Sequence, residues 1–386
     1  MATSSDQSIE KQLGTLADHQ TSLESSDVFR IDPEEDMDQQ MERLMAELNK
    51  LPQEMRTTLD VNTIKRNYQN AKSISILVTG KTGTGKSTLA NGILGVKIQR
   101  ERVAIEGANI TGACTTKVTK YETRKGEIAV ALWDSPGLQD GTANQTDYLR
   151  QMKQQCSKRD LTIYCIKMIE TRFVQGTDNP DIIAMKKITK AFGNDFWKST
   201  VIVLTFANSI EAVNYDIKYL SPEKKIEEIK KVISQWINQI KNILIKDVKI
   251  PKEIVKSILI VPAGHYMEPH IPGCRYWLSN LWFHCVHAIS SPEAKVALVK
   301  INFSRIKRED LINDEDFQRA PEEQPIVVNK EAYSTILRGV LGAIGGGLAG
   351  AGVGVGVGVG TVGLILPISL PVGIVLGVLI GFVACV

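Results

Sequence analysis

Short apolar runs alternate with amphipathic stretches along the middle of the chain. The runs occupy residues 74–79, 127–133, 161–168, 200–206 and 257–262. Between them, hydrophobic residues recur with helical spacing, most clearly after Ser221-Pro222-Glu223, where a capping serine and a proline precede an apolar face that continues to Ile240. Strand-like runs that alternate with helices predict an α/β fold with a mostly parallel sheet flanked by helices.

The N-terminal part has a different pattern from the middle. Residues 1–31 are polar and few of them are large and apolar, so we expect disorder, because too little surface can be buried to offset the entropy cost of ordering. Residues 32–70 contain apolar positions at helical spacing after Pro33, which predicts a helical extension that either docks on its own domain or binds a partner. We assign residues 71–300 to the α/β domain and residues 301–335 to a linker.

The last segment, residues 336–386, is rich in glycine and apolar residues. No Asp, Glu, Lys, Arg or His lies between Gly339 and Val386, and residues 364–386 alone are long enough to cross a bilayer. Glycines that permit close helix contact in lipid recur at every fourth position, at Gly342, Gly346, Gly350, Gly354 and Gly358. We therefore predict a C-terminal transmembrane segment, either one span or a hairpin. The Gly-Val alternation is the alternative sign of a flexible or β-prone linker.

Charge and cysteine content restrict the possible classes of partner and compartment. The formal net charge is +3, and residues 1–72 carry 14 acidic and 8 basic side chains, a net of −6, so no dense basic stripe indicates a nucleic-acid partner. The six cysteines are scattered and no secretory signal peptide opens the chain. These features predict an intracellular protein with unpaired, buried thiols.

A phosphate-loop motif lies between the first strand-like run and a helical stretch. Its pattern, G-x-x-x-x-G-K-[ST], lets backbone N–H groups surround a β-phosphate, while Lys86 reaches the β- and γ-oxygens and the Ser87 hydroxyl is placed to bind Mg²⁺. The motif therefore predicts a nucleoside triphosphate site. Its residues are Gly80, Lys81, Thr82, Gly83, Thr84, Gly85, Lys86, Ser87 and Thr88.

A second motif, Asp134-Ser135-Pro136-Gly137, follows the strand-like run 127–133 directly. In this D-x-x-G arrangement, Asp134 is predicted to hold Mg²⁺ through water and the Gly137 N–H to sense the γ-phosphate. Between the two motifs lie two adjacent threonines, and we prefer Thr116 over Thr115 as the switch residue whose hydroxyl completes Mg²⁺ coordination. The predicted metal ligands are thus Ser87, Thr116 and Asp134.

These motifs give the chain a specific resemblance. It resembles the immune-associated nucleotide-binding GTPases of the AIG type, also called GIMAP-like, which are related to the Toc chloroplast-import receptors and the septins. The resemblance rests on residues 80–87, 112–117, 134–138 and 204–208. It implies a Ras-like P-loop GTPase domain, binding of GTP or GDP with Mg²⁺, nucleotide-controlled self-association and often a C-terminal membrane segment.

The base-recognition region departs from the usual GTPase pattern. Where Asn-Lys-x-Asp is usual, this chain has Thr205-Phe206-Ala207-Asn208, so we expect Thr205 and Asn208 to bind the nucleotide. An amide offers one acceptor where a carboxylate offers two, which weakens the expected preference for guanine over adenine. Backbone N–H groups at Ala263 and Gly264 are predicted to contact the guanine O6, and a simple strand-ending turn is the alternative there.

The catalytic region also departs from Ras-like enzymes, which place a water-orienting glutamine directly after D-x-x-G. This chain has Leu138 at that position and Gln139 one position further on. Arg172 is a candidate arginine finger that would act across a dimer. The predicted catalytic residues are therefore Thr116, Gln139 and Arg172.

His and Cys residues are grouped between positions 265 and 287, so a zinc site is one possible interpretation. The spacings between them, however, match no common zinc motif. The intervening tryptophans and leucines favour a packed amphipathic helix instead.

Together the patterns predict a membrane-anchored GTP-binding protein with its G domain in the cytosol. We expect a Mg²⁺-dependent GTPase that is slow or activated by homodimerisation or higher self-association, and a tail that contacts the lipid bilayer. Two alternatives stay open. One is a nucleotide-gated membrane scaffold that does not hydrolyse, and the other is a membrane-perturbing effector whose glycine-rich tail oligomerises.

Overall fold

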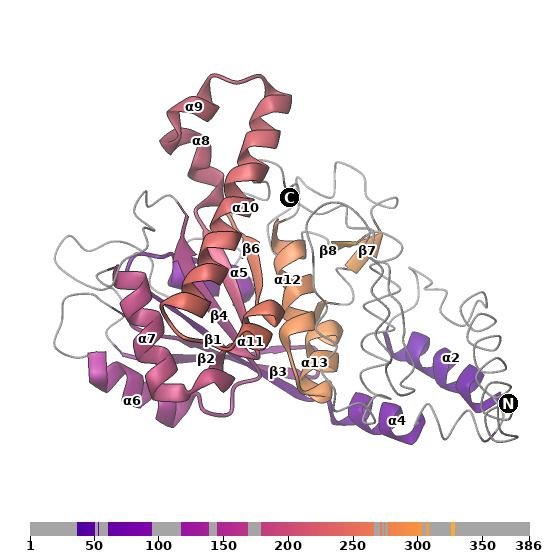
Figure 1. Cartoon of the computed structure of the whole chain (residues 1–386). Coiled ribbons are helices and arrows are strands. Elements are labelled where there is room, and N and C mark those ends of the chain that lie inside the picture. The colour runs from indigo at the N-terminus through magenta and orange to yellow at the C-terminus, as the bar shows by residue number, and fades with distance from the viewer. Residues whose placement is uncertain are drawn as a thin grey trace, which may run out of the picture.

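A twisted sheet forms the centre of the part of the chain that the computed structural model describes (Figure 1). That part comprises residues 37–50, 53, 61–94, 117–138, 145–168, 179–265, 271, 274, 277–302, 306–308 and 326–328. Within it, the central sheet has six strands in the order β2-β3-β1-β4-β5-β6. They are β1 Ser73–Gly80, β2 Thr119–Lys125, β3 Ile128–Asp134, β4 Leu161–Lys167, β5 Thr200–Thr205 and β6 Leu259–Pro262.

The strands are parallel except for β2, which pairs antiparallel with β3 at one edge. β4 and β5 are buried along almost their whole length, whereas β2 alternates between half-buried and exposed side chains. A parallel strand covered on both faces needs a continuous apolar run, and an edge strand with one wet face does not. The predicted α/β fold with a mostly parallel sheet is therefore confirmed.

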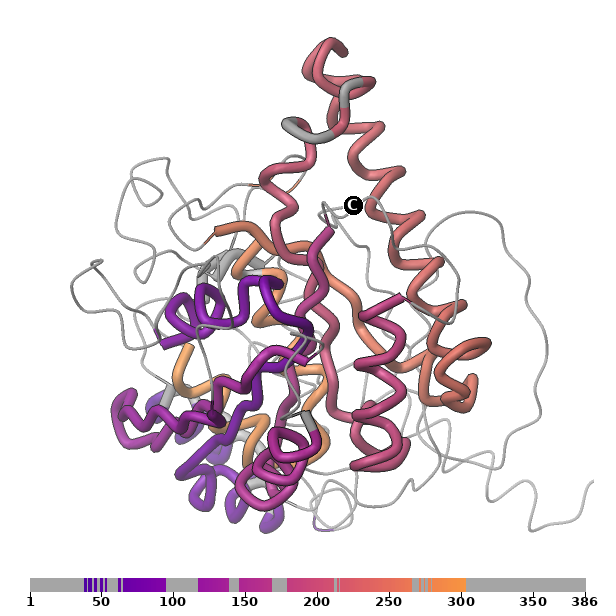
Figure 2. Tube along the Cα trace, turned by 90° about the vertical axis from the view of Figure 1, so that its left-hand side faces the viewer, coloured from indigo at the N-terminus to yellow at the C-terminus, as the bar shows by residue number. Residues whose placement is uncertain are grey.

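Helices cover both faces of this sheet (Figure 2). On one face, α5, α12 and α13 pack against strands β1, β3, β5 and β6, and α6, α7 and α10 lie on the opposite face. The longer helices are α2 Met37–Lys50, α4 Val61–Asn70, α5 Lys86–Leu94, α6 Gln145–Gln155, α7 Pro180–Phe192, α10 Pro222–Lys246, α12 Trp277–Ala288 and α13 Pro292–Asn302. The short ones are η3 Asn194–Trp197, η4 Ala207–Ser209, α8 Ile210–Val213, α9 Tyr215–Lys218 and α11 Lys252–Ser257.

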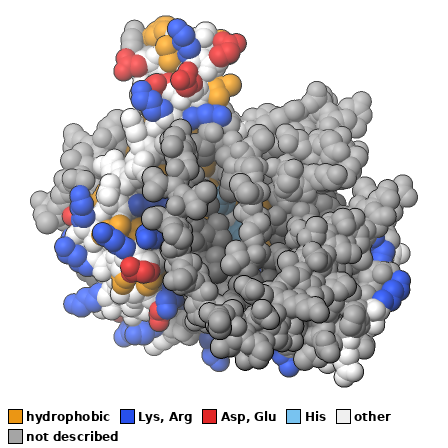
Figure 3. Space-filling model, turned by 45° about the vertical axis from the view of Figure 1, so that its right-hand side comes forward, with side chains coloured by type: hydrophobic (Ala, Val, Ile, Leu, Met, Phe, Trp, Pro, Cys, Tyr) orange, Lys and Arg blue, Asp and Glu red, His pale blue; other side chains and the backbone are white. Residues whose placement is uncertain are grey.

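Helix α10 has Pro222 in its first turn, as the sequence predicts, and continues past Ile240 to Lys246. Its N-terminal end projects from the domain together with α8 and α9 (Figures 1 and 2). Figure 3 shows side chains of both charges and several hydrophobic ones on this projection. Tyr219 and Ile226, which are 67% and 43% exposed, lie there.

The N-terminal helices pack on the domain. α4 contacts both α2 and α13. Tyr68 of α4 donates a hydrogen bond to Asp38 of α2, and the Lys300 Nζ of α13 lies 3.6 Å from the centroid of the Tyr68 ring. Of the two uses that the sequence leaves open for this extension, these contacts favour docking on its own domain.

Several sequence predictions concern residues outside the described part. Residues 1–31 and the tail 336–386 lie outside it. Within the predicted linker 301–335, two short strands, β7 Ile306–Arg308 and β8 Ile326–Val328, pair in parallel. None of the helices in the described residues is both long enough and apolar enough to span a membrane.

The cysteines follow the sequence expectation only in part. Cys156, Cys165 and Cys285 are buried free thiols. Cys274, in contrast, is disulfide-bonded, so the expectation of unpaired thiols is wrong at this position.

Candidate functional site

The phosphate-loop motif connects the end of β1 to the start of α5. Gly80 ends the strand with φ near +146°, and a β-carbon at this position would clash with the Cys165 carbonyl oxygen of the neighbouring strand β4. Only glycine fits that approach without strain. The strand-to-helix context that the motif requires is therefore present, and the loop leads into the N-terminus of the nine-residue helix α5.

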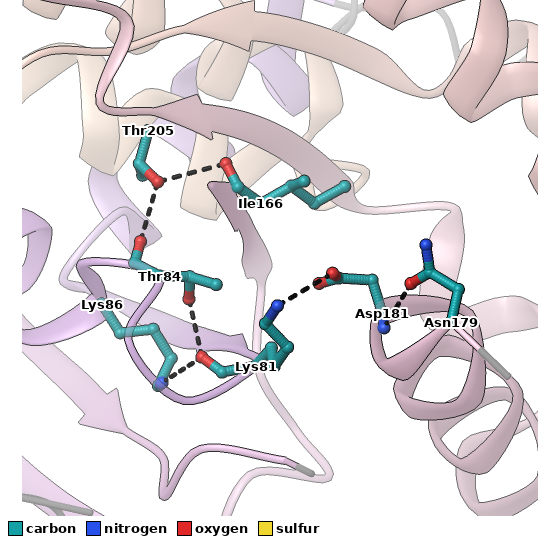
Figure 4. Close-up of polar contacts among 7 residues, drawn as sticks. All are labelled: Lys81, Thr84, Lys86, Ile166, Asn179, Asp181 and Thr205. Carbon is teal, nitrogen blue, oxygen red and sulfur yellow. Dashed lines mark hydrogen bonds and ion pairs between the residues drawn. The ribbon is translucent and has the colours of Figure 1, made fainter. Parts of the chain in front are cut away.

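Two side chains of the loop converge on one backbone carbonyl (Figure 4). Lys86 Nζ donates a hydrogen bond to the Lys81 oxygen at 2.9 Å, and Thr84 Oγ1 donates to the same oxygen at 2.8 Å. Lys86 is only 6% exposed. The ammonium group that the motif assigns to the phosphates is thus held close to the loop backbone.

A hydroxyl and a carboxylate meet at the start of α5. Ser87 Oγ donates a hydrogen bond to Asp134 Oδ2 at 2.8 Å. Asp134 is fully buried and ends β3, where it pairs in register with Val78 of β1. Parallel pairing of β3 with β1 therefore brings together two predicted metal ligands that are 47 residues apart in the sequence. Oxygen ligands of this kind suit Mg²⁺.

The D-x-x-G segment runs beside the phosphate loop. Leu138 N donates to the Gly80 oxygen at 3.1 Å, and Thr82 N donates to the Leu138 oxygen at 3.2 Å. A β-carbon at Gly137 would lie 2.5 Å from Thr82 Cα, so a side chain does not fit there. The two motifs are in direct contact, and Leu138 is completely buried.

The two predicted base-binding segments also lie side by side. Ala207 N donates to the Ala263 oxygen at 3.1 Å, and a β-carbon at Gly264 would lie 3.6 Å from Asn208 Cβ. Thr205 joins this region to the phosphate loop, because its Oγ1 lies 2.8 Å from the Thr84 oxygen (Figure 4).

Phe206 is a residue that we did not select from the sequence. It has a left-handed backbone with φ near 62°, which is uncommon for a bulky residue. A β-carbon at Gly85 would lie 3.3 Å from Phe206 Cε2, and Lys167 Nζ lies 5.1 Å from the ring centroid. Its place in the Thr205–Asn208 segment, where lysine is usual, is the signal that would have identified it.

Asp181 also contacts the motif and was not predicted. Its Oδ2 lies 3.4 Å from Lys81 Nζ, and it belongs to the first turn of α7. No motif includes this position, so the sequence holds no local signal for it.

Three predicted catalytic residues, Thr116, Gln139 and Arg172, lie outside the described residues. Their roles stay predictions.

Burial controls the chemistry of the groups around the motif. Burial raises the pKa of the Cys165 thiol to about 12, while the Lys86 charge acts in the opposite direction. Burial, together with the Asp134 carboxylate, also raises the pKa of Tyr121 on β2. Both groups are therefore protonated at neutral pH, and a neutral thiol is a poor nucleophile.

The His and Cys segment packs as a helix. Trp277, Leu281 and Cys285 of α12 are buried, and α12 packs against β5 and β6. His284 Nδ1 lies 2.7 Å from the Asn280 oxygen. No group of three or more His, Cys, Asp or Glu side chains in the described ranges is placed to hold a metal ion, and His270 lies outside them.

A comparison with known protein families identifies the domain that contains these motifs. Residues 74–249 match the model of the AIG1 family. This part of the chain is an AIG1 family domain. The match begins in β1 and includes the phosphate loop, the D-x-x-G segment and the Thr205–Asn208 segment. The resemblance that these motifs indicate is confirmed for this domain.

Curated relatives of the AIG1 domain include chloroplast translocases. Translocase of chloroplast 34 of Arabidopsis thaliana is 28% identical over 223 residues, which are 56% of this chain and 66% of that protein. GTP-binding protein A of Dictyostelium discoideum is 27% identical over 140 residues, 35% of this chain and 28% of that protein. The chain thus spans less than two thirds of the length of each relative.

One solved structure similar to this chain is that of Toc33 from Arabidopsis thaliana in complex with GDP and Mg²⁺. It is 20% identical with a TM-score of 0.44, and the match covers 68% of this chain and 97% of that one.

Proposed function

We propose that this chain is a guanine-nucleotide switch protein whose AIG1 domain acts as a Ras-like G domain that binds GTP or GDP with Mg²⁺. The observation that carries the proposal is the 2.8 Å hydrogen bond between Ser87 Oγ and Asp134 Oδ2. A phosphate-loop hydroxyl beside a strand-end carboxylate supplies the protein oxygens that such a nucleotide complex needs. The name of GTP-binding protein A, a relative, adds support.

Each motif has a separate role in this proposal. The backbone N–H groups of residues 80–88 and the Lys86 ammonium bind the phosphates. The Gly137 N–H contacts the γ-phosphate, and Thr116 supplies a hydroxyl from the switch region. Mg²⁺, when bound, neutralises charge on the β- and γ-phosphates.

The base is bound by the Thr205–Asn208 and 263–264 segments. Thr205 fixes the first segment to the phosphate loop through its bond to the Thr84 oxygen. We assign the Phe206 ring, which lies beside Gly85, as a stacking surface for the base. Asn208 accepts from the guanine edge, and the backbone of Ala263 and Gly264 completes the contact.

Changing Asn208 to aspartate is expected to tighten GTP binding by about 10-fold, because a carboxylate accepts two hydrogen bonds from the guanine edge and charge-assisted bonds are the stronger ones. Calorimetric titration of the original chain and of Asn208→Asp with GTP and with ATP measures this. The original chain should prefer GTP by a smaller factor than the variant does. Equal or better ATP binding by the original chain would contradict the assignment of guanine.

Hydrolysis is proposed to be slow in the single chain. Leu138, directly after D-x-x-G, is buried, and a hydrophobic side chain cannot orient the attacking water. Gln139 and an Arg172 donated by a second copy are the proposed substitutes. Self-association of the G domain then accelerates turnover.

The dependence of turnover on concentration tests this arrangement. With full-length chain in detergent, phosphate release from GTP is expected to rise faster than linearly with protein concentration. Strictly linear release would contradict activation by a second copy, and a failure to bind GTP or GDP at all would contradict the proposed function.

A second candidate, a nucleotide-gated scaffold without useful turnover, is favoured by the same buried Leu138. Bound nucleotide with no phosphate release at any protein concentration would support the scaffold over the GTPase.

We also propose that the uncharged residues 339–386 anchor the protein in an intracellular membrane with the G domain in the cytosol. The support is the length of the uncharged sequence, which exceeds the ~20 residues that a spanning helix needs.

A further inference from the structure

A buried ion pair joins the phosphate loop to helix α7 (Figure 4). Lys81 Nζ lies 3.4 Å from Asp181 Oδ2, and the two side chains are 14% and 7% exposed. By comparison, the Lys198–Asp195 pair on the surface is 58% and 82% exposed. Desolvation makes a buried pair costly unless its geometry is well defined, so this pair calls for an explanation that surface pairs do not need.

The position of Asp181 is itself fixed. It lies in the first turn of α7, and its N–H donates to Asn179 Oδ1 at 2.9 Å, which caps the helix. A carboxylate in the first turn is also favoured by the helix dipole. α7 therefore presents Asp181 from a firmly held backbone.

The backbone of Lys81 belongs to the phosphate loop, while its side chain points away from Lys86. The Lys81 carbonyl oxygen accepts hydrogen bonds from Lys86 Nζ and Thr84 Oγ1. In Figure 4 the Lys81 side chain extends toward α7, on the side opposite Lys86. Lys81 thus connects the Lys86 ammonium, bound to its carbonyl oxygen, with α7, paired with its side chain.

We propose that Lys81 and Asp181 are a positioning pair for nucleotide binding. The ion pair holds the Lys81 carbonyl, and hence Lys86, in the arrangement that receives the phosphates. The geometry of the loop then depends on α7, which in the sequence follows the segment that contains Arg172. This inference rests on the proposed nucleotide-binding function.

Three variants of the full-length chain test the pair: Lys81→Met, Asp181→Asn and the double variant. Each single variant is expected to bind GDP and a non-hydrolysable GTP analogue about 10-fold more weakly, within the range of measured couplings between contacting residues. Each is also expected to unfold at lower denaturant concentration, because one buried charge loses its ion-pair partner.

The double variant distinguishes positioning from a purely structural role. Because it removes both charges, its stability is expected to return close to that of the original chain, whereas its nucleotide affinity stays about 10-fold lower. Lys81→Arg, which keeps the charge, is expected to recover most of the affinity that Lys81→Met loses. The matched surface control, Lys198→Met with Asp195→Asn, is expected to change neither quantity.

Recovery of affinity together with stability in the double variant would overturn the positioning role. Unchanged affinity in all three variants, with normal binding by the original chain, would also overturn it and leave the proposed function intact. Failure of the original chain to bind nucleotide would overturn both. If a single variant does not fold, the double variant decides alone, because it buries no charge at either position.

Discussion

Replacing Lys86 with alanine is expected to weaken GTP binding by about 100-fold or more, since hydrogen bonds to charged groups are the strong ones and we assign this ammonium to the β- and γ-phosphates. The Lys86 side chain is nearly buried, and its Nζ is bound to the Lys81 oxygen within the loop. No neighbouring basic residue of the motif takes its place, because the Lys81 side chain extends toward α7.

The measurement is a calorimetric titration of the full-length variant with GTP and with GDP. Circular dichroism checks that the fold is kept. Lys252→Ala is a suitable control, because Lys252 is an exposed residue at the start of α11 and should affect neither affinity nor fold. Unchanged nucleotide affinity in Lys86→Ala, with normal binding by the control, would contradict the assignment of the phosphate loop.

Deleting residues 339–386 is expected to move the protein from the membrane fraction to the soluble fraction almost completely. The deleted segment contains no charged side chain, and it is long enough to place ~20 apolar residues in the hydrocarbon. The intact chain should resist carbonate extraction, because high pH does not break the covalent link to an inserted helix. Fractionation of membranes from cells that express each form measures the difference.

Gly350→Ile is the matched control for this deletion. It keeps the length and apolar character of the tail, so membrane retention should not change. Self-association in detergent should decrease, since a large side chain prevents the close approach that glycines at every fourth position permit. Recovery of the intact chain in the soluble fraction would contradict anchoring, and unchanged self-association in Gly350→Ile would contradict the role of the glycine face.

The five parallel strands were predictable because their signals are local, whereas the half-buried edge strand β2 has no apolar run to mark it. Apolar runs at 161–168 and 200–206 correspond closely to β4 and β5, which are buried and therefore must be apolar along their length. The apolar face of α10 extends further than the prediction took it, because Ile243 and Leu244 follow Ile240 at helical spacing and are buried before the helix ends at Lys246.

Part of the candidate site was likewise predictable from the sequence, and part of it was not. The meeting of Ser87 and Asp134 follows from two motifs and the pairing of parallel strands, which place both residues at the same edge of the sheet. The contact of Lys81 with Asp181 joins positions 100 residues apart, and neither belongs to the fixed positions of a motif. Such a tertiary contact leaves no periodic pattern in the sequence. The same holds for the ring of Phe206, whose place depends on an uncommon backbone conformation.

The contact between the D-x-x-G segment and the phosphate loop sets an energy scale for switching. Two backbone hydrogen bonds join Leu138 to Gly80 and Thr82. If each contributes about 1 kcal/mol net, these bonds alone place the form with this segment displaced at least on the order of 2 kcal/mol higher, so that it makes up at most roughly 3% of the molecules. In the proposed switch, a γ-phosphate that draws the Gly137 N–H away from this arrangement would have to favour the displaced form by more than about 30-fold over the bonded one before most molecules adopt it.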